Sequence, residues 1–154
     1  MARSTTPKRH MEPDYRYRDT RITKFINCMM MDGKKTLAQG KLYKAFDIIK
    51  EKTEKEPMET FEKALEYVTP TVEVKPKRIG GANIQIPIEV RKERKYRLFV
   101  RIVLNAARSR KEKTIEERIA MELIEASKGA GKAVKARMNM DKVAEAHRAY
   151  AHLR

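Results

Sequence analysis

Apolar residues recur along the chain with two different periods, and the change of period divides it into predicted elements. From Ile22 to Met30 the apolar residues follow the i, i+3, i+4, i+7 spacing of an amphipathic helix, with Asp19 or Thr20 as its cap and Gly33 as its stop. The same spacing predicts further helices at about 36–52, 57–69, 91–110 and 115–128, and a last helical region from 131 onward.

Period-two alternation replaces the helical pattern between the third and fourth predicted helices. Apolar residues alternate with others from 84 to 90, and 72–79 forms a second extended arm. The arms are joined by Gly80, Gly81, Ala82 and Asn83, in which the glycines supply the positive φ of a tight turn. Prolines at 76 and 87 cannot donate to a ladder, so neither arm is an interior strand of a larger sheet. We expect a hairpin at about 72–90 that stands off the body.

These patterns define a mainly α fold, a six-helix bundle with a protruding two-stranded β-hairpin and a flexible basic N-terminal arm. Residues 1–18 show no apolar period and contain two prolines, so we expect the arm there. A single helical domain at 19–154 fits the length of 154 residues. In the last helical region, the residues expected to be buried are Val134, Met138, Val143, Ala144 and His147.

Charge narrows the class of partner. The chain carries a net charge of +15 and has a pI near 10.0, which predicts a polyanionic partner. The 27 residues from 75 to 101 hold nine Lys or Arg and two Glu, a net +7. By contrast, residues 45–73 hold eight acids and four Lys, a net −4, and this acidic segment should point away from the polyanion.

Basic residues on the hairpin and the predicted helix 91–110 are the main candidates for phosphate binding. Arg94, Arg97, Arg101 and Arg108 are spaced 3, 4 and 7 apart, which places them on one face of that helix, with few acids to pair with them. The full set of candidates is Arg3, Lys8, Arg9, Lys34, Lys35, Lys75, Lys77, Arg78, Arg91, Arg94, Lys95, Arg97, Arg101, Arg108, Lys132, Lys135 and Arg137.

Rival classes of function find weaker support in the sequence. A winged DNA-binding bundle also uses a basic hairpin and helix, but helix 91–110 offers only Asn105 for base edges. Membrane binding is disfavoured because no apolar run is long enough to span and no basic helix carries exposed Trp or Phe. For an enzyme, the three His residues are scattered, and Cys28 is expected to be a packed thiol. We predict no catalysis, cofactor or metal site.

Four segments together resemble one family closely. PDYRYRD, KFINCMMMDGKK, RIGGANIQIPIEV and AVKARMNMDKVAEAHRAYAHLR occur in order over nearly the whole chain. They resemble the bacterial-type small-subunit ribosomal protein number seven family, whose fold is a six-helix bundle with a protruding hairpin. The resemblance implies direct binding to the 3′ major domain of 16S ribosomal RNA (rRNA) and nucleation of head assembly. It also implies a cytoplasmic ribosome, with an organellar one as the alternative left open.

The resemblance further implies neighbours and site residues. The hairpin tip, at Gly80, Gly81, Ala82 and Asn83, would lie beside the exit-site transfer RNA (tRNA) at the subunit interface. Ribosomal proteins nine and eleven of the small subunit would be protein partners, and some bacterial members repress translation of their own operon's messenger RNA. The candidates for protein contact near the C-terminus are His147, Tyr150 and His152.

Overall fold

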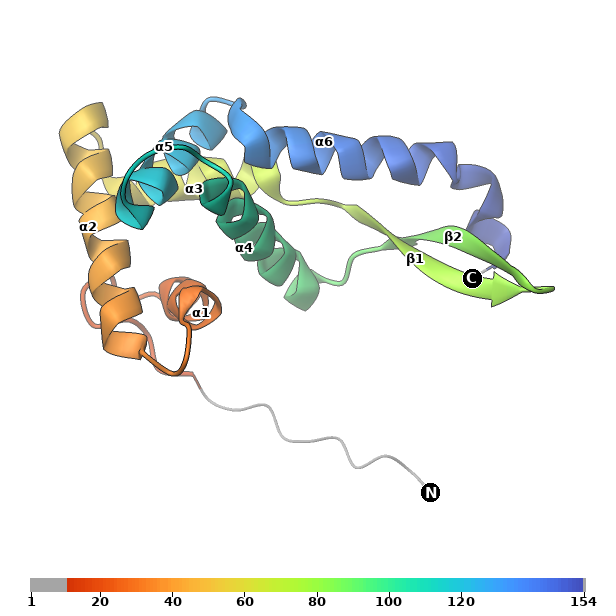
Figure 1. The fold of residues 1–154 in the computed structure, drawn as a ribbon, viewed down its shortest axis with the longest axis horizontal. Helices are drawn as coiled ribbons and strands as arrows, with labels where there is room; N and C mark the ends of the chain where they lie inside the picture. The colour runs from red at the N-terminus through yellow and green to blue at the C-terminus, as the bar shows by residue number, and fades with distance from the viewer. Residues whose placement is uncertain (1–10, 154) are drawn as a thin grey trace, which may run out of the picture. The chain divides into compact units, whose positions relative to one another are not determined.

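The computed structural model describes residues 11–153, and its contacts divide the chain into two compact units, 1–39 and 40–154. The predicted fold class is confirmed for the described residues, since they form six α-helices and one two-stranded antiparallel sheet (Figure 1). Their order is α1 (Thr20–Met29), α2 (Lys35–Thr53), α3 (Pro57–Val68), β1 (Val72–Ile79), β2 (Ala82–Glu89), α4 (Lys92–Arg108), α5 (Ile115–Ser127), α6 (Gly131–Ala146) and the 3₁₀ helix η1 (Arg148–Leu153). The single domain expected at 19–154 stays a prediction.

In the first unit, α1 begins as the sequence predicts. The Asp19 side chain caps the helix by accepting a hydrogen bond of 2.7 Å from the Arg21 amide. Ile22, Phe25, Ile26 and Met29 are buried. The expectation that the single cysteine is packed was wrong, because its position on α1 lies outside the buried stripe and its side chain is exposed.

The structure describes only part of the N-terminal arm expected at 1–18. Residues 1–10 lie outside the described part of the chain. From 14 onward the backbone forms a turn, in which the buried Asp14 carboxylate accepts hydrogen bonds of 3.1 Å from the amides of Arg16 and Tyr17. The Arg18 amide closes the same turn on the Asp14 carbonyl oxygen at 2.8 Å. This segment therefore has a defined local structure.

Three aromatic rings mark the core of the second unit. Phe61 of α3 packs edge-on against Phe46 of α2, with 6.1 Å between ring centres, and against Phe99 of α4, with 5.5 Å. All three side chains are fully buried, and α5 packs against both α3 and α4. The apolar residues on one side of α2 are all buried, namely Ala38, Leu42, Ala45, Phe46 and Ile49.

The hairpin has the predicted two arms and a shorter turn than predicted. Val72 pairs with Glu89 at its base and Ile79 with Ala82 at its tip. Only Gly80 and Gly81 form the turn, with φ of 57° and 87°, and Ala82 already belongs to β2. Positive φ at both central residues is the type I′ geometry that follows the twist of the strands.

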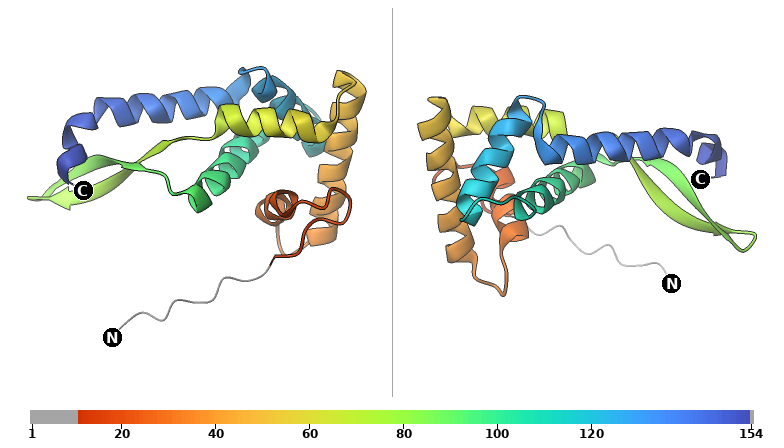
Figure 2. Two further views of the ribbon diagram at one scale, coloured as in Figure 1. Left: turned by 180° about the vertical axis from the view of Figure 1, so that it is seen from behind. Right: turned by 45° about the horizontal axis from the view of Figure 1, so that its top comes forward.

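Half of the hairpin is supported by the C-terminal elements. α6 contacts β1 and η1 contacts β2, so the chain returns along the hairpin after the helical core (Figure 2). Glu73, Ile86 and Pro87 near the base are buried, whereas Lys77, Arg78 and the turn are exposed. The expectation of a hairpin that stands off the body therefore applies to its outer half.

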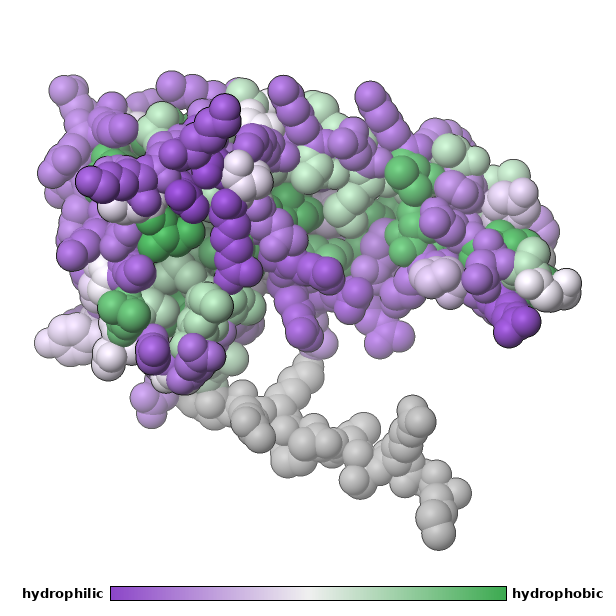
Figure 3. All heavy atoms as spheres, viewed as in Figure 1, coloured by the Kyte–Doolittle hydropathy of each residue, from purple (hydrophilic) through white to green (hydrophobic). Residues whose placement is uncertain are grey.

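The same arrangement corrects the burial expected along α6. Val134 and Ala144 are buried as predicted, but Met138 is 48% exposed and Val143 42% exposed, and His147 is only half-buried. Beyond its first turns α6 lies along a narrow ribbon, which covers one side of the helix and leaves the other open. Figure 3 shows hydrophobic residues among hydrophilic ones at the end of the molecule that holds the hairpin.

A buried ion network joins the segment after α4 to α5 and α6. Arg110, whose side chain is only 11% exposed, makes a two-pronged contact with Glu125 at 2.7 and 2.9 Å and also contacts Glu122 and Glu112 at 2.7 and 2.8 Å. Glu122 is completely buried and accepts a hydrogen bond of 2.6 Å from the Ala133 amide in α6. The Glu122 carboxylate thus binds both the Arg110 guanidinium and a backbone amide in the first turn of α6.

Titration of the network follows from its geometry. Hydrogen bonding to Glu125 is the main cause that raises the pKa of Arg110, so the guanidinium stays charged. The same hydrogen bond lowers the pKa of Glu125.

At the start of α6, Gly131 has φ of +91°, and a Cβ there would lie 3.1 Å from the Glu122 carboxylate. Glycine is required at this position for both reasons.

Replacing Arg110 with Met should cost about 3–5 kcal/mol of unfolding free energy, because Glu122 stays buried without its charge partner. Urea unfolding followed by circular dichroism measures the loss. The matched control is Arg148→Met, which removes an ion pair to Glu145 that is largely exposed on both sides. That control should cost less than about 1 kcal/mol. Equal losses in the two variants would contradict a structural role for the buried network.

Candidate nucleic-acid interface

The exposed face of α4 carries almost only arginine. Phe99, Val103 and Ala107 face the core and are fully buried. The opposite strip follows the i, i+3, i+4 spacing of one helix face and is exposed throughout; its members are Arg94, Arg97, Arg101, Asn105 and Arg108. Sequence periodicity therefore predicted both faces of this helix. Lys95, at the edge of the strip, is only partly exposed.

A buried carboxylate connects this helix to the hairpin. The Nε atom of Arg94 lies 2.8 Å from the carboxylate of Glu73 in β1, and the Nζ atom of Lys75 lies 3.2 Å from it. The side chain of Glu73 is 8% exposed. Arg94 and Lys75 were predicted only as phosphate ligands, but both are partly neutralised here, and Arg94 fixes the base of the hairpin to α4. The pairing spans 21 residues of sequence and has no local signal.

Glu73 titrates below its ordinary range because of these two cations. Its burial by itself acts to raise its pKa, but hydrogen bonds and charge from Arg94 and Lys75 outweigh burial and lower the pKa below the usual 4.5. The carboxylate is therefore ionised at neutral pH. Through Arg94, the Glu73 carboxylate fixes the base of the hairpin against the first turn of α4.

The remaining cations of this region are exposed. Lys77 and Arg78 lie on the outer half of β1, and Arg91 stands at the cap position of α4, directly after the hairpin. We define the hairpin–α4 surface as the following exposed cations of these elements: Lys75, Lys77, Arg78, Arg91, and the α4 arginines beyond the one paired with Glu73, namely Arg97, Arg101 and Arg108. An array of this kind, on a ribbon and a helix held together by a buried ion pair, is suited to binding phosphates.

The basic cluster predicted on α6 is divided by local contacts. Lys132 donates hydrogen bonds to the Ser109 carbonyl oxygen at 2.7 Å and to its hydroxyl at 3.1 Å, which closes the end of α4. Arg137 lies 2.9 Å from Asp141, one turn further along α6. Lys135 is exposed. Of the three, Lys135 is the best placed for a phosphate.

The other predicted residues belong to the first unit or to the ends of the chain. Lys34 and Lys35 are exposed where the turn with Gly33 leads into α2. The candidates Arg3, Lys8 and Arg9 lie outside the described residues. Gly80, Gly81, Ala82 and Asn83 are exposed at the hairpin tip.

The C-terminal candidates form a small group around η1. His147 Nδ1 lies 2.8 Å from the Val143 carbonyl oxygen, and its ring centre is 6.4 Å from that of Tyr150. His152 Nδ1 lies 2.8 Å from the Ala149 carbonyl oxygen. Tyr150 is 41% exposed. These contacts order the tail and leave the Tyr150 ring partly exposed.

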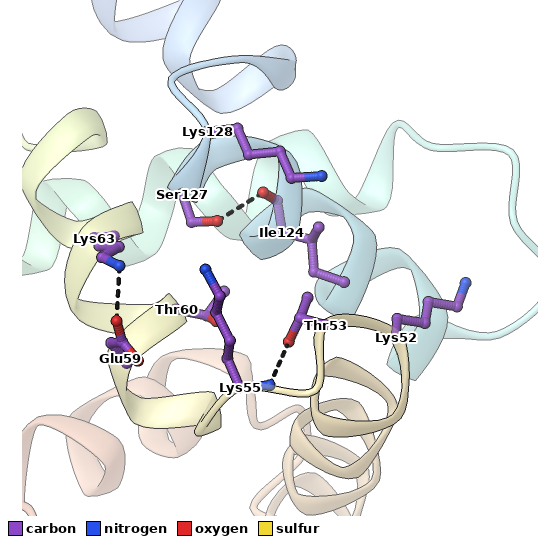
Figure 4. Close-up of a pocket in the computed structure, with 9 residues that line it drawn as sticks. All are labelled: Lys52, Thr53, Lys55, Glu59, Thr60, Lys63, Ile124, Ser127 and Lys128. Carbon is purple, nitrogen blue, oxygen red and sulfur yellow. Dashed lines mark hydrogen bonds and ion pairs between the residues drawn. The ribbon is translucent and has the colours of Figure 1, made fainter.

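A second group of cations, which the sequence did not predict, lines a pocket between the α2–α3 link and the end of α5. Lys52, Lys55, Lys63 and Lys128 surround it, with Glu59 as the one acid in its lining (Figure 4). Lys63 is paired with Glu59 at 2.7 Å. The pocket lies mostly within the acidic segment 45–73, which makes it a weaker attractor of polyanions than the hairpin–α4 surface.

Metal clusters and membrane-spanning helices are both absent from the described residues. Among them, no group of three or more His, Cys, Asp or Glu side chains could hold a metal ion. None of the helices in this part of the chain is long and apolar enough to cross a membrane.

Comparison with known proteins gives consistent matches over nearly the full length. The family described as "Ribosomal protein S7p/S5e" matches residues 1–148. Similar proteins include "Small ribosomal subunit protein uS7" of Magnetococcus marinus and of Carboxydothermus hydrogenoformans, each 48% identical, and that of Moorella thermoacetica, 50% identical. Each alignment spans 152 residues and covers 99% of this chain and 97% of the relative.

Glu73→Gln should destabilise the hairpin base by about 1.5–3 kcal/mol at neutral pH, because it removes charged hydrogen bonds to Arg94 and Lys75. Hydrogen exchange of the Val90 amide, which bonds to the Thr71 carbonyl at 3.0 Å, and urea unfolding measure the loss. The folded pKa lies below 4.5, so the contribution is present above that pH and is lost as pH falls through the folded pKa.

The variant should therefore differ from the unmodified protein at pH 7 and approach it in acid. Glu89→Gln on the same hairpin is the control, because this carboxylate is exposed. A Glu73→Gln effect that stays constant down to acidic pH would contradict the assignment.

Proposed function

The chain belongs to the ribosomal protein S7p/S5e family, and from this premise we propose that it is a structural component of the small ribosomal subunit that binds 16S rRNA through its hairpin–α4 surface. Its role is not enzymatic, and as a ribosomal component it works in the cytoplasm. The observation that carries the proposed interface is the arginine strip of α4, exposed along its length and fixed to a basic hairpin through Glu73.

Affinity would come from counterion release, and specificity from shape. Each Lys or Arg that neutralises a phosphate displaces condensed cations, which makes the affinity depend on salt. The major groove of A-form RNA is too narrow for side chains to enter, so a rigid ribbon and helix would recognise the fold of an RNA junction rather than its base edges. The Glu73–Arg94 contact supplies that rigidity, because it holds the two basic elements in one arrangement.

We assign finer roles on the same basis. The RNA target is the 3′ major domain, where early binding would nucleate assembly of the subunit head. The exposed tip from Gly80 to Asn83 would lie beside exit-site tRNA, and exposed apolar side chains near η1, such as Tyr150, would contact ribosomal proteins eleven or nine. The same surface could bind the messenger RNA of its own operon, because the phosphate chemistry is identical.

Changing Arg97, Arg101 and Arg108 together to Ala should weaken binding to a 3′ major domain fragment. The slope of log K against log salt should become shallower by roughly two to three, about 0.7–0.9 for each phosphate that the variant no longer neutralises. Filter binding over a salt series measures it. Arg94 is left in place because its change would also loosen the hairpin through Glu73.

The control variant removes the same number of positive charges at a different site on the protein. Lys52, Lys55 and Lys128 around the pocket of Figure 4 are changed together to Ala, which lowers the net charge equally at a pocket that lies mostly within the acidic segment 45–73. This control should change the slope by less than about one. Equal slopes for both triple variants would mean that net charge alone, and not the α4 strip, governs binding.

Shortening the hairpin tip should reduce retention of exit-site tRNA more than rRNA affinity. Removing Arg78, Ile79, Ala82 and Asn83 while keeping the two turn glycines preserves the pairing of Lys77 with Ile84 below. Binding of tRNA to subunits reconstituted with this variant, beside filter binding to rRNA, separates the two effects.

Arg78→Ala is the control for the one charge removed with the tip. It should reproduce any small change in rRNA affinity without the loss of tRNA. A shortened hairpin that loses both kinds of binding equally would make the tip a primary rRNA anchor instead.

A further inference from the structure

A single tyrosine stands almost fully in solvent on the turn before α1. Tyr15 is 93% exposed, more than any other large hydrophobic residue in the described part of the chain, and the next value is 68% for Met31. Single apolar side chains exposed on a protein surface are normal, so exposure alone does not assign the ring a role. A role has to be argued from the surroundings of the ring.

The backbone beneath Tyr15 is held firmly. Its neighbour Asp14 is buried, and the carboxylate accepts hydrogen bonds from the amides of the next two residues, Arg16 and Tyr17, and from the Gln39 side chain at 3.3 Å. The Glu12 carbonyl accepts a further hydrogen bond of 2.9 Å from the buried Thr23 hydroxyl. The turn therefore presents the ring from a fixed base, which lowers the entropy lost when a partner binds.

Two arginines follow the ring in sequence, whereas the exposed Glu12 and the buried Asp14 precede it. The Arg16 guanidinium lies 5.4 Å from the centre of the Tyr17 ring, within the range of a cation–π contact. Arg18 is exposed and has a φ of 51°, in the left-handed region. A little further along, Arg21 contacts Asp19 at 2.7 Å, so this acid is occupied within α1 and its cap. An exposed ring followed by two arginines is typical of single-stranded RNA sites, where bases stack on aromatic side chains and phosphates meet Arg.

We infer that Tyr15 is a stacking platform for an unpaired base of the bound RNA, with Arg16 and Arg18 beside it on the phosphates. The inference rests on the proposed function, because it needs the chain to bind RNA. It adds a contact to bases that the hairpin–α4 surface does not supply. RNA is favoured over a protein neighbour because Arg16 and Arg18, which follow the ring, supply cations for phosphates, while Asp14 is hydrogen-bonded within the turn and Asp19 is paired with Arg21.

Tyr15→Ala should raise the dissociation constant for a 3′ major domain fragment by roughly 5- to 150-fold, the range for losing one stacked base. The slope of log K against log salt should stay unchanged, because no charge is removed. Tyr15→Phe should keep the affinity, since stacking needs the ring and not the hydroxyl. The control is Tyr67→Ala, which removes a ring that is 47% exposed on α3, within the acidic segment.

A fluorescent variant tests the contact directly. The chain contains no tryptophan, so Tyr15→Trp gives one reporter, and stacking on a base should quench it along the same binding curve. Tyr67→Trp should stay unquenched. The hydrogen bonds of the turn come from Asp14 and the backbone, so these variants should fold as the unmodified protein does, which circular dichroism checks.

The possible failures are distinct. If the unmodified protein does not bind the fragment, the proposed function fails. If it binds, but Tyr15→Ala binds equally well or Tyr15→Trp is not quenched, the stacking platform is wrong. A loss with Tyr15→Phe as large as with Tyr15→Ala would assign the effect to the hydroxyl and would also overturn the inference.

Discussion

Buried carboxylates that hold cations connect the elements of the 40–154 unit. Glu122 is fully buried and joins Arg110 to the first turn of α6, while Glu73 joins Arg94 of α4 to the base of the hairpin. A buried charge is tolerated only when it is paired and hydrogen-bonded, so each of these carboxylates fixes the position of its partners. The basic surface can be rigid because the buried Glu73 carboxylate fixes the base of the hairpin to α4.

This arrangement separates two uses of positive charge. Cations with acidic or carbonyl partners serve the fold, as Arg110, Arg137 and Lys132 do. Exposed cations such as Arg97 and Arg101 of α4 are distributed along one helix face. A net charge of +15 would otherwise oppose compaction through self-repulsion, and pairing the cations nearest the core reduces that cost.

Periodic features were predictable from the sequence, and contacts between distant residues were not. The α1 stripe, the capping box in which Thr114 and Glu117 bond reciprocally, and the Gly80–Gly81 turn follow local rules, and the structure has all three. The pairing of Glu73 with Arg94 and of Arg110 with Glu125 crosses elements, so no spacing rule could predict it. The number of buried residues along α6 was overestimated for a related reason. The spacing of its apolar residues predicts a helix, but it does not show that the helix packs against a narrow hairpin.

The identity of the cations is as informative as their number. The exposed strip of α4 contains four arginines and no lysine, whereas the outer hairpin mixes Lys77 with Arg78. Arginine offers a planar fork that matches two phosphate oxygens at once, while lysine acts as a point charge on a flexible stem. Two-pronged binding of a phosphate by arginine is favoured when the backbone is held in place. The inner face of α4 is held by the buried Phe99, and its first turn is held by the contact of Arg94 with Glu73. The arginine strip therefore lies where geometric recognition of phosphates is possible, and the mixed outer hairpin lies where adaptable contact suffices.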